Sequence, residues 1–223
     1  MSENYTFKIK KTINKAAKID PDYKVFGAKK HKYILNPVIS LNQVRQFEQK
    51  YQITLPEEYV YFLTQIGNGG AGPYYGIYSL ETVDQKNYCL NKSVPNLVFI
   101  DNTLTPELWK EKTQILEDSD CSDEIYDEIE AQVTAGGLEI GTQGCTYGNI
   151  LMYKGSETGK IVYFDWDISS ESPPYLTGMT FLDWYLSFFE EIAAGHYVTS
   201  FGYKLLCTEE ALIELFYFIV QKS

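Results

Sequence analysis

The stretch that decides the fold is Leu55-Pro56-Glu57-Glu58-Tyr59, continued by Phe62-Leu63 and by Gly67-Asn68-Gly69-Gly70. Pro56 suits the first turn of a helix, because its missing N–H would be unpaired there in any case. The two glutamates that follow stand at the positive end of the helix dipole. Gly67 ends the apolar periodicity, and we expect it to adopt the left-handed conformation that caps a helix. The stretch therefore predicts a helix with strong start and stop signals and carries no catalytic chemistry.

A second helix is predicted just before this stretch. Ser40 and Gln43 have the spacing of a capping box, and apolar residues follow at helical spacing at Leu41, Val44, Phe47 and Tyr51. Within the deciding stretch the apolar positions are Tyr59, Phe62, Leu63 and Ile66. Because the linker between the two patterns is short, we expect both helices to share one core.

The rest of the chain alternates between strand and helix patterns. Glycine-bounded runs at 76–80, 138–140, 150–153 and 161–164 indicate strands of an antiparallel meander. A helix is expected from Thr180 to Ile192, and another after Thr208, which would be its N-cap. We therefore expect an α+β fold in which an antiparallel β-sheet is packed by N- and C-terminal helices.

These motifs together resemble the SUKH superfamily, which includes Smi/Knr-type fungal cell-wall regulators and many bacterial immunity proteins. The resemblance runs over residues 33–192. Its motifs are Asn36-Pro37, Phe47-Glu48, the deciding stretch, Ala71-Gly72-Pro73-Tyr74-Tyr75-Gly76-Ile77, Gly144-Cys145-Thr146-Tyr147, Gly159-Lys160-Ile161-Val162-Tyr163 and Phe181-Leu182-Asp183-Trp184-Tyr185. It implies a structural role for Phe47, Glu48, Leu55, Pro56, Tyr59, Phe62, Leu63, Asn68, Gly69 and Gly70. It implies a binding scaffold that acts on a protein partner without being an enzyme.

Two segments depart from a minimal domain of this kind. Residues 1–32 carry nine lysines and three acidic side chains, a charge of +6, and their weak periodicity predicts a lysine-rich arm that is a tail or a short strand. Residues 101–131 carry 11 acidic side chains against Lys110 and Lys112. Thr105-Pro106-Glu107 and the spacing of Ile125, Ile129 and Val133 predict two helices in this acidic insert. We thus divide the chain into the arm at 1–32 and a SUKH-like domain at 33–223.

The charge distribution limits the possible partners. The net charge is −11, so the residues after the arm carry −17 from 10 basic and 27 acidic side chains. Such a surface repels nucleic acid and favours a basic protein, although many acidic proteins owe their charge to solubility alone. The 19 tyrosines suit both core margins and interfaces.

The cysteines and apolar segments give no sign of a metal site or a membrane anchor. The four cysteines form no C-x-x-C pair, and only His31 and His196 could join them, so we expect neither zinc nor another cofactor. The N-terminus lacks a secretory signal, and no apolar run reaches the ~20 residues of a membrane helix. We expect a cytoplasmic protein with reduced thiols.

Catalytic interpretations are weak in this sequence. Asp165 and Asp167, two apart on a strand, share a face, which is an arrangement that can hold a metal or flank a substrate, but solvated aspartates at a strand end are the simpler interpretation. The glycines at 67–72 lack the Lys-Ser/Thr of a phosphate loop. Cys145 lies in a glycine-rich turn without a sequence-adjacent histidine, and most lone cysteines are inert.

The function predicted from the sequence is therefore binding. The first hypothesis is an immunity protein that neutralises a basic, nuclease-type toxin, and the second is a regulatory or scaffolding protein of the Smi/Knr type. A metal-dependent enzyme using Asp165 and Asp167 is the third. The predicted partner contacts are Tyr74 and Tyr75, the cluster Asp118, Asp120, Asp123 and Glu124, and Asp165 with Asp167.

Overall fold

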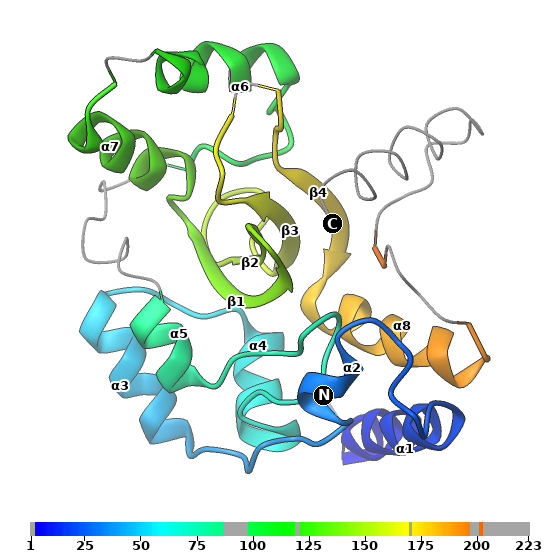
Figure 1. Cartoon of the computed structure of the whole chain (residues 1–223). Helices are drawn as coiled ribbons and strands as arrows, with labels where there is room; N and C mark the ends of the chain where they lie inside the picture. The colour runs from blue at the N-terminus through cyan, green and yellow to red at the C-terminus, as the bar shows by residue number, and fades with distance from the viewer. Residues whose placement is uncertain (1–2, 87–97, 119–120, 170, 197–200, 203–223) are drawn as a thin grey trace.

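The structure of the chain is a computed structural model that describes residues 3–86, 98–118, 121–169, 171–196 and 201–202. A central sheet lies between two layers of helices (Figure 1). One layer contains α1 (Glu3–Ile19), α3 (Leu41–Tyr51), α4 (Glu57–Tyr61) and α8 (Phe181–Ala193). The other contains α6 (Pro106–Thr113) and α7 (Asp123–Val133). The expected α+β fold is confirmed.

The sheet is an antiparallel meander in the order β1-β2-β3-β4. Its strands are β1 (Gly137–Gly144), β2 (Tyr147–Met152), β3 (Lys160–Asp165) and β4 (Tyr175–Thr180). The first three were predicted, whereas β4 was missed because its sequence YLTGMT contains a glycine and lacks a continuous apolar run. Both faces of the central strands are buried, and successive side chains enter opposite cores: Leu151 faces α1 and α8, whereas Ile150 and Met152 face α6 and α7.

The larger core joins the deciding stretch to α8. Tyr59, Phe62 and Leu63 are fully buried. The Phe62 ring packs edge-on against Phe181 and Tyr185, with centroids 5.2 Å and 5.0 Å away. The helix predicted at residues 180–192 is confirmed as α8, which Thr180 caps by accepting the Asp183 N–H.

The polar residues of the deciding region connect the helices to the loops. The capping box of Ser40 and Gln43 is confirmed at the start of α3. Glu48, only 7% exposed, accepts the Leu55 N–H at 2.8 Å and thereby ties α3 to the next helix. Asn68 accepts the Leu80 N–H at 2.8 Å and donates to Glu81 at 3.0 Å. These contacts explain why polar side chains recur between apolar ones here.

The end of the signature helix differs from the prediction. After α4 the chain continues as a π-helix, η1 (Phe62–Ile66), and Gly67 has φ −178° and ψ 147°. The left-handed cap predicted at Gly67 is therefore wrong, because the chain leaves the helix in an extended conformation. The left-handed positions lie further on, at Gly69 (φ 81°) and Gly70 (φ 96°), where a side chain would meet backbone atoms.

The strand predicted at residues 76–80 is also wrong. Ile77 makes isolated bridges to Gly70 and Gly141, and Leu35 makes one to Gly70. Leu80 already begins α5 (Leu80–Lys86). The apolar residues at 76–80 resemble a strand because Ile77 does pair with the neighbouring backbone. It does so only through single bridges, so no β-ladder forms.

The secondary structure predicted for residues 1–32 needs correction as well. Residues Glu3–Ile19 form α1, which packs along α8, and Ala28–His31 form the short helix α2. Ile9, Ile13 and Ala16 are buried at helical spacing. The abundant lysines on the exposed side concealed this narrow apolar stripe in the sequence. The division into an arm and a domain stays a prediction.

The acidic insert forms the second helical layer. The predicted start of α6 at Thr105 and the helix predicted around Ile125, Ile129 and Val133 are confirmed, although Ile125 itself is exposed. A 3₁₀ turn, η3 (Gln114–Glu117), follows α6. Trp109 is 1% exposed and donates its indole N–H to the Ser169 carbonyl at 2.7 Å. It packs with Val133, Ile150 and Phe164 in a smaller core.

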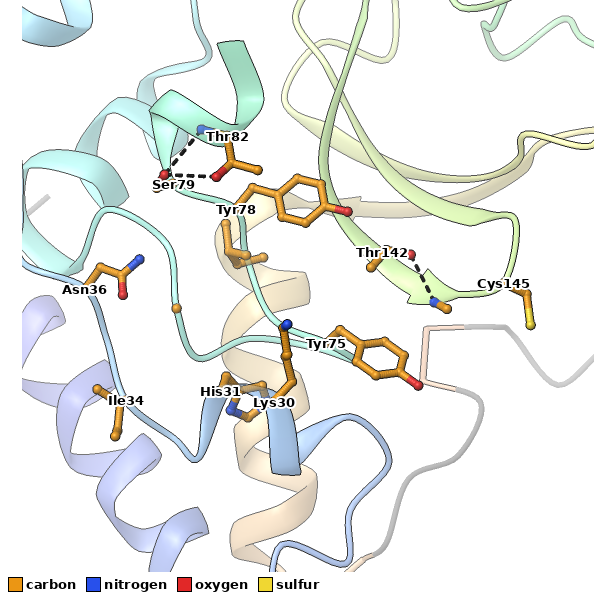
Figure 2. A pocket seen from close by; sticks show the side chains of 13 residues that line it. Lys30, His31, Ile34, Asn36, Tyr75, Tyr78, Ser79, Thr82, Thr142 and Cys145 are labelled. Carbon is orange, nitrogen blue, oxygen red and sulfur yellow. Dashed lines mark hydrogen bonds between the residues drawn. The ribbon is translucent and has the colours of Figure 1, made fainter. Parts of the chain in front are cut away.

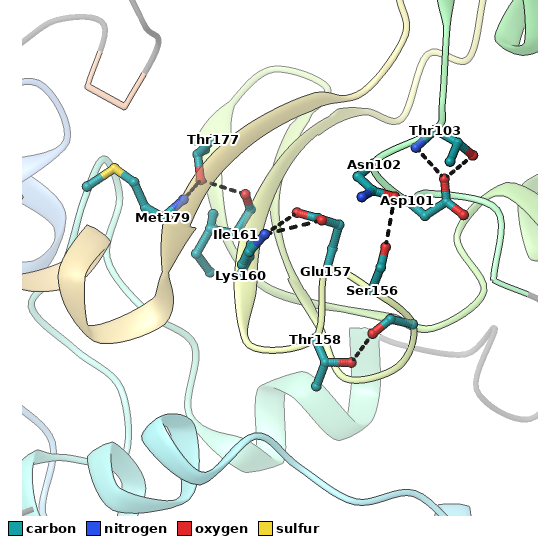
Figure 3. A network of polar contacts seen from close by, with 11 residues as sticks. Asp101, Asn102, Thr103, Ser156, Glu157, Thr158, Lys160, Ile161, Thr177 and Met179 are labelled. Atoms are coloured by element: carbon teal, nitrogen blue, oxygen red, sulfur yellow. Dashed lines mark hydrogen bonds and ion pairs between the residues drawn. The ribbon is translucent and has the colours of Figure 1, made fainter.

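A polar network joins the start of the insert to the β2–β3 turn (Figure 3). The Ser156 hydroxyl donates to Asn102 at 3.4 Å, and Glu157, only 4% exposed, pairs with Lys160 at 3.0 Å. Asp101 accepts the backbone N–H of Thr103 at 2.7 Å. The Ser156–Asn102 bond joins the insert to the turn, whereas the other two contacts are local to the turn and to the insert. The helix predicted after Thr208 lies outside the described residues.

Candidate functional site

One candidate site is the outer surface of the insert, which we call the acidic face. Its members are exposed carboxylates, and they are Glu107, Glu111, Glu117, Asp118, Asp123, Glu124, Asp127 and Glu128. Of the cluster predicted from the sequence, Asp118, Asp123 and Glu124 belong to it, whereas Asp120 lies outside the described residues.

Apolar side chains are exposed among these carboxylates. Leu108 and Ile115 are each 47% exposed and Ile125 is 36% exposed. Leu108 and Ile115 are seven residues apart across α6 and η3, so they fall on one side of that segment, opposite the buried Trp109 and Thr113. Apolar side chains within a charged surface are typical of a protein interface.

Helix caps fix the start of each helix that carries the acidic face. The Ser122 hydroxyl accepts the Ile125 N–H at 3.4 Å, and Thr105 accepts the Leu108 N–H at 3.3 Å. Hydrogen bonds from its own backbone N–H and then from Ser122 lower the pKa of Glu124. In the same way, hydrogen bonds from its own backbone N–H and then from the Thr105 side chain lower the pKa of Glu107. Both carboxylates are therefore ionised at neutral pH.

The turn that contains Asp165 and Asp167 lies beside α7. The Tyr126 hydroxyl of α7 donates to the Trp166 carbonyl at 2.9 Å. Burial raises the pKa of Tyr126, and the charges of Glu130, Asp167 and Asp165 raise it further. The fold thus brings together two of the predicted contact groups that are far apart in the sequence.

The same turn shows how Asp165 and Asp167 are used locally. Asp165 Oδ1 accepts the backbone N–H of Asp167 at 3.1 Å, which closes the turn. The Asp165 charge, after burial, raises the pKa of Tyr147 to about 12. Across the residues that the structure describes, no three His, Cys, Asp or Glu side chains gather closely enough to hold a metal.

A second candidate site is a pocket of about 630 Å³ beyond the β1 edge of the sheet (Figure 2). Three segments far apart in the sequence form it: residues 30–36, residues 70–82 and the turn between β1 and β2. Figure 2 shows Lys30 of α2 beside Tyr75, with Tyr78 and Thr142 on the other side and Cys145 near the turn.

The two tyrosines predicted as contacts have different roles in this region. Tyr74 is 5% exposed and donates its hydroxyl to the Phe201 carbonyl at 2.7 Å, which also accepts the Tyr163 hydroxyl at 2.7 Å. Its side chain is therefore part of the core. Tyr75 is 37% exposed, lines the pocket and meets the Phe26 ring edge-on at 5.4 Å.

His31 lies in the floor of the pocket as a neutral ring. It is 7% exposed, and its Nδ1 accepts the Tyr33 N–H at 3.0 Å. Burial lowers the pKa of His31 to about 4, against the opposing effects of the Asp20 carboxylate and then the Gly72 carbonyl. Nε2 makes no hydrogen bond of normal geometry to a described residue. A ring this weakly basic is a poor general base, so it gives no support to a catalytic role for Cys145, which lines the same pocket.

Strained backbone surrounds the pocket. Lys32, Tyr33, Tyr74 and Cys145 all have positive φ, at 50°, 60°, 56° and 49°. Non-glycine residues seldom adopt this conformation, and such positions concentrate at functional sites. Sequence reasoning missed the pocket because its walls meet only through long-range packing; the run of lysines at 29–32 was the one available signal.

The family comparison agrees with the sheet, the helices and the motif geometry. Residues 38–187 match the model of the SMI1 / KNR4 family (SUKH-1). The chain belongs to this family. The match spans the sheet, the acidic insert and the start of α8 but not α1 or α2. No curated protein and no solved structure matches the chain. Members of the SUKH superfamily act as protein-interaction modules.

None of the described helices has both the length and the apolar character to cross a bilayer.

Proposed function

We propose that this SUKH-family chain is a non-enzymatic binding protein whose acidic face binds a basic protein, and that it acts as an immunity protein against a nuclease-type toxin. The observation that carries the proposal is the acidic face itself, with eight exposed carboxylates and three exposed apolar side chains on the helices of one insert. Such a surface offers long-range attraction and a contact that can exclude water.

The charge of the face suits a nuclease. A nuclease attracts nucleic acid through a basic cleft, and a carboxylate-rich surface can occupy that cleft. The turn of Asp165 and Asp167 adds two carboxylates beside α7. Association of this kind is fast and weakens as salt rises, because exposed charges are screened beyond about 8–10 Å at physiological ionic strength.

A second function, regulation or scaffolding without a toxin, is favoured by the family to which the chain belongs. The two functions differ in genomic context. A toxin gene next to this gene supports immunity, and an isolated gene supports regulation. Metal-dependent catalysis at Asp165 and Asp167 is not proposed, because no third ligand accompanies them among the described residues.

The test uses three forms of the full chain as bait in lysate of the native cell. These are the wild type, the variant D118K/D123K/E124K, and the control D22K/E57K/E190K, which reverses as many exposed carboxylates on the other side of the sheet. We expect the wild type and the control to capture a basic protein that salt releases. D118K/D123K/E124K should not capture it.

The captured protein is then purified and tested for cleavage of DNA and RNA. Stoichiometric inhibition by the wild type, and much weaker inhibition by D118K/D123K/E124K, would support the immunity proposal. A captured protein without nuclease activity would favour the regulatory function. Equal capture by all three baits would remove the acidic face from the interface.

A further inference from the structure

The pocket beyond β1 has the opposite charge to the acidic face. Lys29, Lys30 and Lys32 are exposed on α2 and its cap, and Lys30 lines the pocket. Within the described ranges, none of these three lysines makes an ion pair. Figure 1 places α2 on the far side of the sheet from α6 and α7. The lysines are thus a separate positive rim on a protein of net charge −11.

Exposed apolar side chains lie around the same rim. Ile34 is 63% exposed, Phe26 is 45% exposed and Tyr75 is 37% exposed. Ile34 and Tyr75 line the pocket, and Phe26 packs on Tyr75. Apolar groups of this size, left exposed beside a hollow, are typical of a surface that a partner covers.

The polar groups of the walls are already engaged within the chain. The Tyr78 hydroxyl donates to Glu139 at 3.3 Å, Thr142 Oγ1 donates to the Tyr147 carbonyl at 2.9 Å, and Asn36 donates to the Asn68 carbonyl at 2.9 Å. With these three groups engaged, the lysine ammonium groups and the apolar surfaces are the main contacts that the rim offers to a ligand. His31 adds no positive charge at neutral pH because its ring is neutral.

We propose that this pocket is a second docking site, which takes an acidic segment of a protein partner that carries an aspartate or glutamate next to an apolar side chain. The carboxylate would pair with the lysine rim, and the apolar side chain would enter between Tyr75 and Ile34. The volume of about 630 Å³ lies within the roughly 300–1,000 Å³ of small-ligand pockets and gives room for a short peptide segment. This proposal is independent of the acidic face and of the toxin.

A long polyanion fits this site poorly. The positive rim is short, and the residues after position 32 carry a charge of −17. A nucleic acid or an anionic bilayer would extend past the rim onto that repulsive surface. A peptide segment can present one or two carboxylates to the lysines and end there.

The test is a selection of random 12-residue peptides, displayed on phage, against the full chain, with removal of those that bind K29E/K30E/K32E. We expect the selected peptides to contain Asp or Glu beside an apolar residue. Synthetic copies should bind K29E/K30E/K32E about tenfold or more weakly in fluorescence polarisation. The control K10E/K11E/K18E makes the same charge change on α1 and should bind like the wild type.

A second variant tests the apolar half of the site. Tyr75→Ala should weaken the same peptides, provided that circular dichroism shows an unchanged fold. Selected peptides without acidic residues, or peptides that bind all variants equally, would overturn the proposal. So would tight, rim-dependent binding of a DNA duplex or of phosphatidylserine vesicles.

Two further probes distinguish a partner from the chain itself. A synthetic peptide of residues 203–223 that binds with the same dependence on Lys29, Lys30 and Lys32 would assign the pocket to this chain's own segment. A dimer seen in sedimentation, and abolished by K29E/K30E/K32E, would assign it to a second copy. Either result would overturn the assignment to a partner.

Discussion

The acidic face and the lysine-rimmed pocket are built in different ways. The acidic face is the outer side of two regular, capped helices whose inner sides bury Trp109 and Val133. The pocket is made of short segments with positive φ at Lys32, Tyr74 and Cys145, held by buried hydrogen bonds. The charged surface thus rests on regular helices that are held by a core beneath them. The pocket instead depends on residues with unusual backbone conformations in several of its segments.

The substitution with the largest expected effect tests whether the core beneath the acidic face unfolds separately from the core beneath the pocket. Trp109→Ala should lower the free energy of unfolding by about 4 kcal/mol, because it leaves a cavity and removes the indole hydrogen bond to the Ser169 carbonyl. Hydrogen exchange should rise in α6 and α7 and not at residues 30–36. Leu108→Ala is the control, with an effect of less than about 0.5 kcal/mol. Equal loss of protection in both regions would show that the two layers unfold as one.

A second substitution loosens the pocket side. Asp20 is fully buried and accepts the Lys24 and Val25 N–H groups and the Tyr33 hydroxyl, at 2.6, 3.1 and 2.7 Å. Asp20→Ala would remove the buried acceptor of these three hydrogen bonds, and we expect a loss of about 3 kcal/mol in urea unfolding. The exposed Asp22 is the control, since Asp22→Ala should change stability by less than about 0.5 kcal/mol. A small effect of Asp20→Ala would mean that the residues around α2 do not depend on this carboxylate.

The same contrast explains what the sequence could and could not predict. Helices α3, α6, α7 and α8 and three strands followed from caps, spacing and glycine boundaries, which are local signals. The helix α1 was missed because three buried residues are outweighed by exposed lysines. The pocket was missed because it depends on single bridges between Leu35, Gly70 and Ile77.

The predicted binding residues also divide into those that a local sequence signal identifies and those whose position depends on long-range packing. The cluster of Asp118, Asp123 and Glu124 could be read from charge density, and the structure exposes it. Tyr74 was included because it adjoins Tyr75, yet its positive φ of 56° turns the side chain to the core, where it bonds the Phe201 carbonyl. Of two neighbouring residues in an irregular loop, one can therefore belong to the core and the other to the surface. No local sequence pattern shows which is which.

A pH titration tests the neutral ring beneath the pocket. The unfolded pKa of histidine is about 6.5, and that of folded His31 is about 4. The unfolded chain binds more protons between these values, so stability is present above pH 6.5 and is lost as pH falls toward 4. Relative to His31→Gln, the wild type should lose about 2 kcal/mol of unfolding free energy between pH 7.5 and 5.

The acidic face supplies the control for this titration. Residues 101–131 contain no histidine, so D118K/D123K/E124K should keep the wild-type dependence between pH 7.5 and 6. A wild type and a His31→Gln variant with parallel pH profiles would contradict the neutral buried ring.

The smallest effect tests the strain around the pocket directly. Cys145 has φ 49°, and an L-residue in this conformation costs about 1–2 kcal/mol. Cys145→Gly removes that cost but adds freedom to the unfolded chain, so we expect a net gain below about 1 kcal/mol in thermal unfolding. The neighbouring Thr146 is exposed and has no positive φ, so Thr146→Gly should have the opposite sign, a loss of about 0.5–1 kcal/mol. A loss in both variants would mean that the turn is relaxed, and strain would then no longer distinguish the pocket from the regular helices of the acidic face.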